Sequence, residues 1–266
     1  MRLSVHHETR YRFTEPQARI VQLLRLFPAD TSHQTVVNWR IDVDCDARLR
    51  DSIDGYGNIT RMLYAEGPVE TLLLTVSGEA LLTEGDGPIE GTDEPFPPEL
   101  FRRVTALTRA DAVIEGLGQG DDRAAMTALA AAIHARWPLD RRPAPAIRAA
   151  VDAVRDDRLS PRDMAQIFIA AARARGIPAR YTSGYSLSGD DERRTAAPHA
   201  WVEAHVAGGW YAFDPAIGGR SQLDHVRVAV ALDAAGAAPI AGVRMGAGDE
   251  AIDVDVDVRV EDNVQA

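Results

Sequence analysis

The sequence of 266 residues predicts an α+β protein, in which an N-terminal antiparallel β module precedes a domain of helices packed on an antiparallel sheet. Three observations predict this class. Residues 1–83 consist of alternating, β-rich runs, residues 99–175 carry apolar side chains at helical spacing, and short β-rich runs return after Gly176. The stretch 84–98 is acidic and rich in Gly and Pro, so we expect a linker there and domains at 1–83 and 99–266.

The β module is expected to contain several strands. "LSVHHETRYRF" (3–13) alternates in polarity, and "TVVNWRIDVD" (35–44) and "ETLLLTVSGEALL" (70–82) are further β-rich runs. "DGYGN" (54–58) predicts a turn between two strands, because Gly and Asn accept positive φ.

Helices are expected over four ranges, roughly 99–117, 122–137, 144–157 and 160–175. The last helix has the clearest boundaries. Ser160 is the expected N-cap, Pro161 the first helical residue and Asp163 the capping-box acid, while Gly176 stops the helix and Pro178 prevents its resumption.

The remaining sequence predicts strands at "ARYTSGYSL" (179–187), "AWVEAHV" (200–206), "WYAFD" (210–214) and "HVRVAVAL" (225–232), with a hairpin turn at Gly208 and Gly209. "AIDVDVDVRV" (251–260) alternates strictly between apolar and charged residues. It therefore predicts a half-buried strand close to a sheet edge, where the charged side chains disfavour pairing with another chain.

Composition limits the classes of partner and compartment. The net charge of −11 disfavours nucleic acid and anionic membrane surfaces as partners. The single cysteine, Cys45, excludes a disulfide framework and a thiolate metal site within one chain. The N-terminus has no apolar signal region and no stretch approaches the ~18 apolar residues of a spanning helix, so we expect a cytoplasmic protein.

Three motifs follow one another along the chain: Gly-Ile-Pro-Ala-Arg-Tyr from Gly176, His-Ala-Trp from His199 and Asp-Pro from Asp214. Together they resemble the core of the transglutaminase-like superfamily. "HETRYRF", "LLRLFP" and "DGYGN" are similar to the N-terminal region of its bacterial two-part members, and residues 239–260 fit their closing segment. The resemblance implies a bacterial protein with a papain-like fold and a Cys-His-Asp triad. It also implies acyl transfer or peptide hydrolysis at amides through a Cys thioester, without an organic cofactor.

The resemblance places His199 and Asp214 at triad positions but does not supply the nucleophile. The position where the family has its cysteine is Pro161, and Leu159 replaces an expected Gly. Pro161 has neither a thiol nor a backbone N–H, so it provides neither a nucleophile nor an oxyanion donor. "ALDA" (231–234) also stands where the family usually has Gly-Arg-Asp-Tyr.

Two other residues could replace the missing thiol. Ser160 carries a hydroxyl, but a shift of one residue rotates the side chain by about 100° at a helix start, and capping already uses its oxygen. We therefore favour the N-cap role and keep the nucleophile as an alternative. Cys45 lies among acids that would raise the pKa of its thiol, so we expect an incidental thiol.

Other residues near the motifs have weaker assignments. Trp201, Arg180 and Tyr185 are candidate ligand-binding residues, Arg180 as a carboxylate ligand or a structural residue. Glu203 and His205 are expected to face solvent. Together with His199 they share one strand face but spread over ~20 Å, so no metal site is expected there.

We expect a non-catalytic member of the family that retains its cleft for a peptide or protein ligand. One alternative is an active hydrolase or acyltransferase that uses Ser160 or another group with His199 and Asp214. A second alternative is a structural scaffold with a filled cleft. The sequence leaves the ligand and the oligomeric state open.

Overall fold

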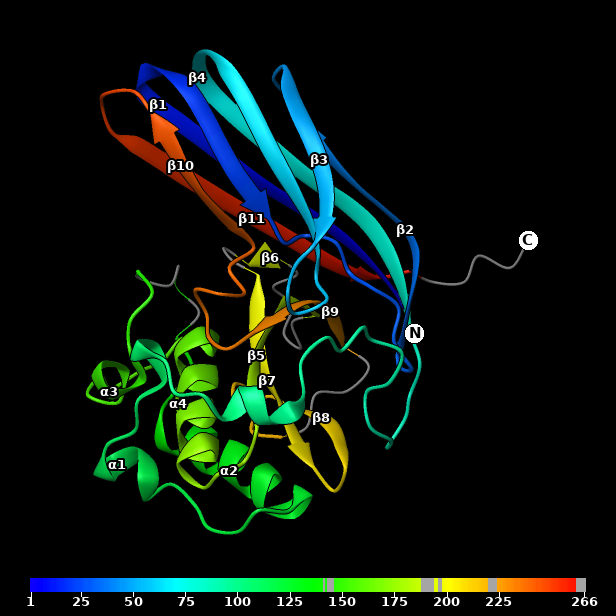
Figure 1. Ribbon diagram of the computed structural model, residues 1–266, viewed down its shortest axis with the longest axis vertical. Coiled ribbons are helices and arrows are strands. Elements are labelled where there is room, and N and C mark those ends of the chain that lie inside the picture. The colour runs from blue at the N-terminus through cyan, green and yellow to red at the C-terminus, as the bar shows by residue number, and fades with distance from the viewer. Residues whose placement is uncertain (141, 143–145, 188–193, 196–197, 220–223, 262–266) are drawn as a thin grey trace.

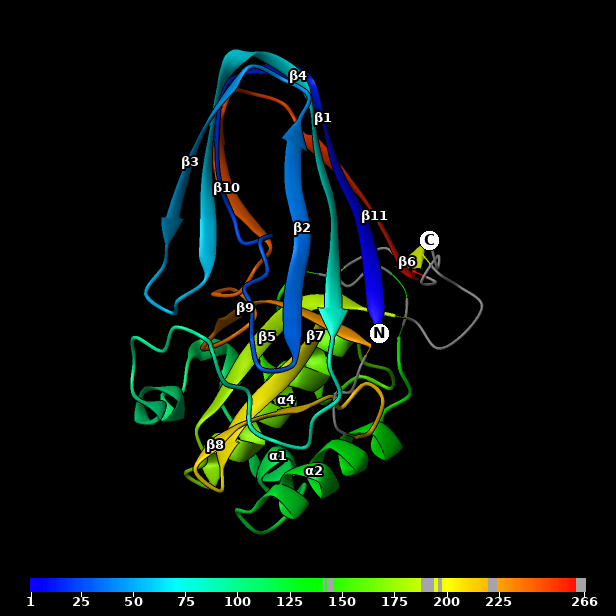
Figure 2. The same cartoon turned by 90° about the vertical axis from the view of Figure 1, so that its right-hand side faces the viewer.

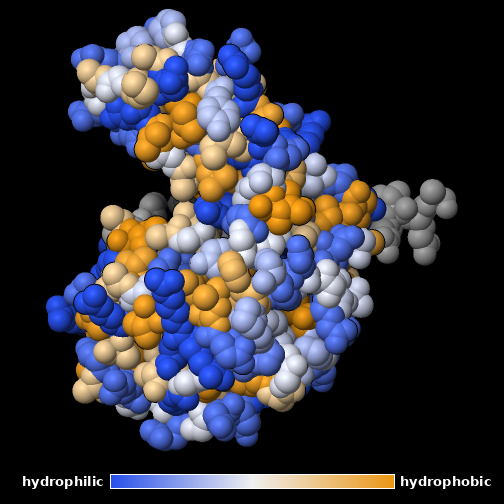
Figure 3. All heavy atoms as spheres, in the orientation of Figure 1, coloured by the Kyte–Doolittle hydropathy of each residue, from blue (hydrophilic) through white to orange (hydrophobic). Residues whose placement is uncertain are grey.

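The computed structural model describes residues 1–140, 142, 146–187, 194–195, 198–219 and 224–261. Figure 1 shows a long twisted sheet above a lobe in which helices cover a smaller sheet. Figure 3 shows the same two lobes as a surface, with a hollow between them on one side. Among the described residues, no helix is long and apolar enough to cross a membrane.

The long sheet is antiparallel, and its strands follow the order β2-β4-β1-β11-β6, with β3 paired to β4 and β10 paired to β1. The strands are β1 (Arg2–Leu24), β2 (Gln34–Val43), β3 (Ala47–Ile53), β4 (Ile59–Leu82), β6 (Arg194–Thr195), β10 (Ile240–Met245) and β11 (Glu250–Val260). The β1–β4 register shifts between Arg12 and Arg19, where the two long strands become irregular.

The predicted extent of the second domain, 99–266, is wrong at its C-terminal end. Strands β10 and β11 both pair with β1, so residues 240–260 complete the first sheet. Val256 and Val258 are buried in one cluster with Leu3 and Val5, which explains the strict alternation of β11. That alternation specifies which face of a strand is buried, but it does not specify the neighbouring strand.

The helical lobe has two main helices, α2 (Arg123–Arg136) and α4 (Pro161–Ala174), with one-turn helices α1 (Ala112–Glu115) and α3 (Ala150–Ala153). The expected helix at 99–117 is instead broken into 3₁₀ turns at Pro98–Arg102 and Ala106–Thr108 followed by α1. Extended backbone at Arg103 and Arg109 ends each turn. Of the expected helix at 144–157, residues 144 and 145 lie outside the described residues, and the rest contains only the single helical turn α3.

The smaller sheet has the order β8-β7-β5-β9, from β5 (Ala179–Ser186), β7 (His199–Val206), β8 (Gly209–Phe213) and β9 (His225–Ala231). Ala200, Val202 and Ala204 share the core with α4. Side chains alternate along a strand, so His199, Trp201 and Glu203 lie on the opposite face. The hairpin turn between β7 and β8 uses Ala207 and Gly208 at positive φ, one residue earlier than expected.

The expected linker lies against the smaller sheet. We call residues 83–97 the strap. It leaves β4 and passes in front of β7 and β8 in Figure 2. The backbone N–H of Ile89 donates to the carbonyl of Trp210, and the carboxylate of Glu94 accepts from Arg180 at 2.7 Å. These contacts fix the strap across the sheet face that carries Trp201.

Candidate functional site

His199 and Asp214 lie at hydrogen-bond distance, 2.7 Å from Nε2 to Oδ2. The β7–β8 hairpin produces this approach, because His199 begins β7 and Asp214 directly follows β8. Burial opposes ionisation of Asp214, but His199 and His225 outweigh it and hold the carboxyl pKa below its usual range. An ionised carboxylate only accepts, so Nε2 of His199 donates to Oδ2 of Asp214.

His225 is a member of this site that the sequence analysis did not identify. It begins β9, with Nε2 2.8 Å from Oδ2 of Asp214 and Nδ1 2.6 Å from Oδ1 of Asp224. Burial disfavours the charged ring, but the hydrogen bonds to Asp214 and Asp224 raise its pKa to about 9. At neutral pH His225 is therefore an imidazolium held between two carboxylates. Its sequence context, an Asp-His pair before an apolar run, gave no sign that it would reach Asp214.

The charge on His225 predicts a pH dependence of stability. Its folded-state pKa of about 9 exceeds the ordinary value of 6.5, so its contribution is complete below pH 6.5 and disappears as the pH rises through about 9. In chelator-containing buffer, the wild type should lose roughly 3 kcal/mol of unfolding free energy over that range relative to His225→Gln. Urea unfolding at successive pH values measures this, and parallel curves for the two proteins would contradict it.

The start of α4 is built as a cap. The Oγ of Ser160 accepts from the backbone N–H of Asp163 at 3.2 Å and donates to Oδ2 of Asp163 at 2.8 Å. Arg148 holds the same carboxylate. Ser160 is buried, and Pro161 occupies the first helical position without an N–H. The hydroxyl that could replace a thiol is therefore committed to Asp163 on both its donor and acceptor sides.

Ser160→Ala is expected to cost about 1–2 kcal/mol of unfolding free energy, because it removes the cap and the bond to Asp163. Ser52→Ala is the matched control, since Ser52 is exposed on a strand and its loss should change stability by less than about 0.5 kcal/mol. Denaturant unfolding measures both. Unchanged stability, together with loss of a measurable amide-directed activity, would make Ser160 a nucleophile instead.

The only cysteine lies far from this site in the fold. Cys45 follows β2 in the long sheet, where it packs against the core of that lobe. Burial and the carboxylates of Asp44 and Asp46 raise the pKa of its thiol, as the sequence predicts. It is therefore a poor nucleophile.

Two of the candidate binding residues are interior residues. Arg180 is fully buried and donates to Glu203 and Glu94, each at 2.7 Å, so its carboxylate partners belong to the chain itself. Tyr185 is buried, with its hydroxyl 2.9 Å from Nδ1 of His7. Neither is open to a ligand. The expectation that Glu203 faces solvent is also wrong, since Arg180 and Arg227 pair with it inside the protein.

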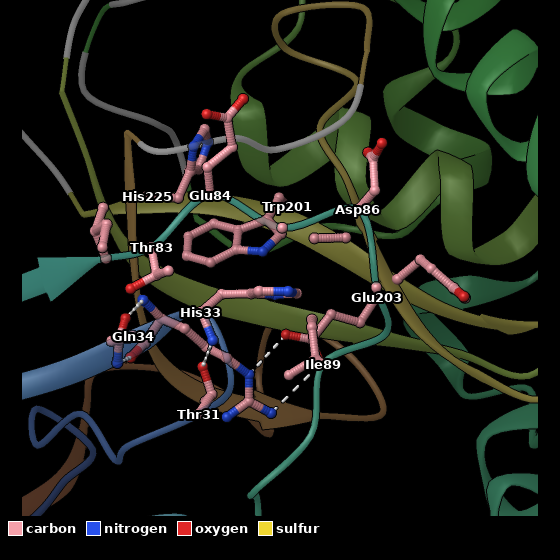
Figure 4. Close-up of a pocket in the computed structure, with 16 residues that line it drawn as sticks. Thr31, His33, Gln34, Thr83, Glu84, Asp86, Ile89, Trp201, Glu203 and His225 are labelled. Atoms are coloured by element: carbon pink, nitrogen blue, oxygen red, sulfur yellow. Dashed lines mark hydrogen bonds and ion pairs between the residues drawn. The ribbon is translucent and has the colours of Figure 1, made fainter. Parts of the chain in front are cut away.

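Trp201, the third candidate, is also buried, with 2% of the residue exposed, but it lines a pocket of about 170 Å³ between the strap, the Thr31–Gln34 segment and the outward face of the smaller sheet. Figure 4 shows its indole between Glu84 of the strap and His33. The ring lies over Gly184, where a Cβ would come within 2.7 Å of it. His225 lines the same pocket and lies 4.9 Å from Trp201 between ring centroids, so it connects the pocket to Asp214.

The chain matches two family models. The bacterial transglutaminase-like N-terminal region matches residues 3–80, and the transglutaminase-like superfamily core matches residues 111–215. An uncharacterized protein of Mycobacterium leprae (strain TN) is 28% identical and aligns with 97% of this chain and 98% of its own length.

A solved structure shows the same fold. The structure of a candidate cysteine protease from Cytophaga hutchinsonii superposes with a TM-score of 0.75 at 18% identity, over 100% of this chain and 92% of that one. The predicted α+β, transglutaminase-like fold is thus confirmed. With both regions matched in the expected order, the resemblance to bacterial transglutaminase-like proteins is confirmed over residues 3–80 and 111–215.

Proposed function

We propose that this chain is a non-catalytic member of its family that binds a segment of a peptide or protein. The observation that carries the proposal is the start of α4. The sequence resemblance assigns the family's nucleophile position to Pro161, and the neighbouring hydroxyl of Ser160 both donates to and accepts from Asp163. No amide substrate can form a covalent acyl intermediate with a proline side chain.

The pocket beneath the strap supports a binding role. Its volume of about 170 Å³ suits one side chain of a longer ligand. Pockets for whole small-molecule ligands are usually larger, ~300–1,000 Å³. Trp201 offers an aromatic wall, and the exposed Glu84 adds a carboxylate at the rim. This combination favours a side chain with an apolar stem and a basic end.

The first test is for turnover. The purified chain is incubated with a peptide library, with and without an added amine, and products are followed by mass spectrometry. We expect the same result for the wild type and His199→Ala, with no cleavage or transamidation in either. Turnover that depends on His199 would overturn the non-catalytic assignment, and its loss in Ser160→Ala would support the active alternative.

The second test is for binding. The same peptide library, fused to phage, is panned on the immobilised chain. We expect enrichment of peptides with a basic residue, and at least tenfold weaker binding of the enriched peptides to Glu84→Arg. Glu90→Arg is the matched control, because Glu90 is exposed on the same strap but does not line the pocket. Failure to enrich any peptide would favour the scaffold alternative.

A further inference from the structure

Three ligand-type side chains converge from three separate segments. One ligand atom each of His199, Asp214 and His225 lies within 4.8 Å of the other two, and Nε2 of each histidine contacts Oδ2 of Asp214. Imidazole nitrogen and carboxylate oxygen are common zinc ligands. This set is not the group of His199, Glu203 and His205 on one strand. The three residues of that group are spread along the strand, and the carboxylate of Glu203 is already paired with two arginines.

The outer contacts of these side chains leave the converging atoms available for an ion. Asp224 accepts from Nδ1 of His225, which fixes that ring with Nε2 directed at Asp214. The backbone N–H of Ala216 donates to Oδ1 of Asp214 at 2.8 Å, which leaves Oδ2 as the inward oxygen. Metal-ligating histidines in proteins are held by carboxylates in this way, and their carboxylate ligands are themselves hydrogen-bonded.

The charges of the cluster also match a divalent ion. Asp214 is buried and Asp224 is two-thirds buried, so their two negative charges need compensation. With two neutral imidazoles, one divalent cation balances both.

We propose that His199, Asp214 and His225 bind one divalent metal ion, and that Zn²⁺ fits their donor set. The ion takes the place of the two N–H protons that now join the imidazoles to Oδ2 of Asp214. His225 releases its Nε2 proton to solvent, and His199 carries its proton on Nδ1. Two imidazoles and one carboxylate leave a fourth tetrahedral position. Because the His199 side chain is 16% exposed, water or a ligand carboxylate can reach that side of the cluster.

Direct metal titration tests the site without reference to any activity. Chelator-treated protein is titrated with Zn²⁺ by calorimetry, and with Co²⁺ by its visible ligand-field absorption. We expect one ion per chain. His199→Ala and His225→Ala should each weaken binding by at least 100-fold. Asp224→Asn, which changes only the outer carboxylate, should weaken it by about 10–100-fold.

Two control variants exclude adventitious binding. His205→Ala removes a histidine on the same face of β7, and His6→Ala removes one beside the N-terminus; both should bind as the wild type does. Asp224 is partly exposed, so Asp224→Asn keeps the test decisive if His225→Ala fails to fold. Less than one equivalent bound by the wild type, or affinity unchanged in Asp224→Asn, would overturn the proposal. Failure of peptide binding would leave this result unaffected, since the two measurements are separate.

Discussion

A cysteine introduced at position 161 is expected to ionise well below the ordinary thiol pKa of about 8.5. Pro161→Cys restores a thiol and an N–H at the first position of α4, a 14-residue helix whose N-terminus favours an anion. His199 has Nε2 bound to Asp214, so its Nδ1 is the nitrogen available to the thiol. We expect the thiol pKa to fall by about one unit or more, because the helix end and an imidazolium both stabilise the thiolate.

The measurement is the pH dependence of alkylation by iodoacetamide, in a Cys45→Ser background so that one thiol reports. Arg123→Cys in the same background is the matched control, because residue 123 is the first position of α2 and its side chain contacts Asp86 and Tyr211. The pKa of the thiol at position 123 should fall less than that of the thiol at position 161. Adding His199→Ala to Pro161→Cys should raise the pKa to that control value. An alkylation rate that rises only near pH 8.5 would mean that residue 161 does not face His199.

Local features of the site follow directly from the sequence. The pairing of His199 with Asp214 depends on a short hairpin, so the order of two motifs predicts it. The Ser160 cap depends on residues three positions apart in one helical turn. In both cases the partners are close in sequence, and the geometry of one hairpin or one turn brings them together.

Features that depend on pairing between distant strands do not follow from the sequence. His225 reaches Asp214 only because β9 pairs with β5. Residues 240–260 join the first sheet through pairing with β1, across more than 200 residues. Glu203 looks like an exposed charge on an alternating strand, and only its neighbours Arg180 on β5 and Arg227 on β9 explain its burial. Alternation predicts faces, whereas partners depend on topology.

Glu203 also gives the largest expected effect on stability. Its Oε2 lies 2.7 Å from Nε of Arg180 and its Oε1 lies 2.7 Å from Nε of Arg227. Arg180 is also completely buried, and its guanidinium carbon lies 4.0 Å from the centre of the Trp210 ring. Glu203→Gln keeps the volume but removes the charge, so that Glu94 becomes the carboxylate that pairs with Arg180 among the described residues. Breaking a buried pair in this way should cost about 3–5 kcal/mol.

Urea unfolding at pH 7 measures this loss, and Glu66→Gln is the matched control. Glu66 pairs with Arg19 at 3.4 Å but is 63% exposed, so its replacement should change stability by less than about 1 kcal/mol.

The pH dependence of stability gives an independent check. Burial opposes ionisation of Glu203, but Arg227 and Arg180 lower its pKa to about 2. Its contribution is therefore complete above pH 4.5 and disappears as the pH falls toward 2, a dependence that Glu203→Gln should lack. A Glu203→Gln protein as stable as Glu66→Gln would mean that these charges do not hold the strap and the smaller sheet together.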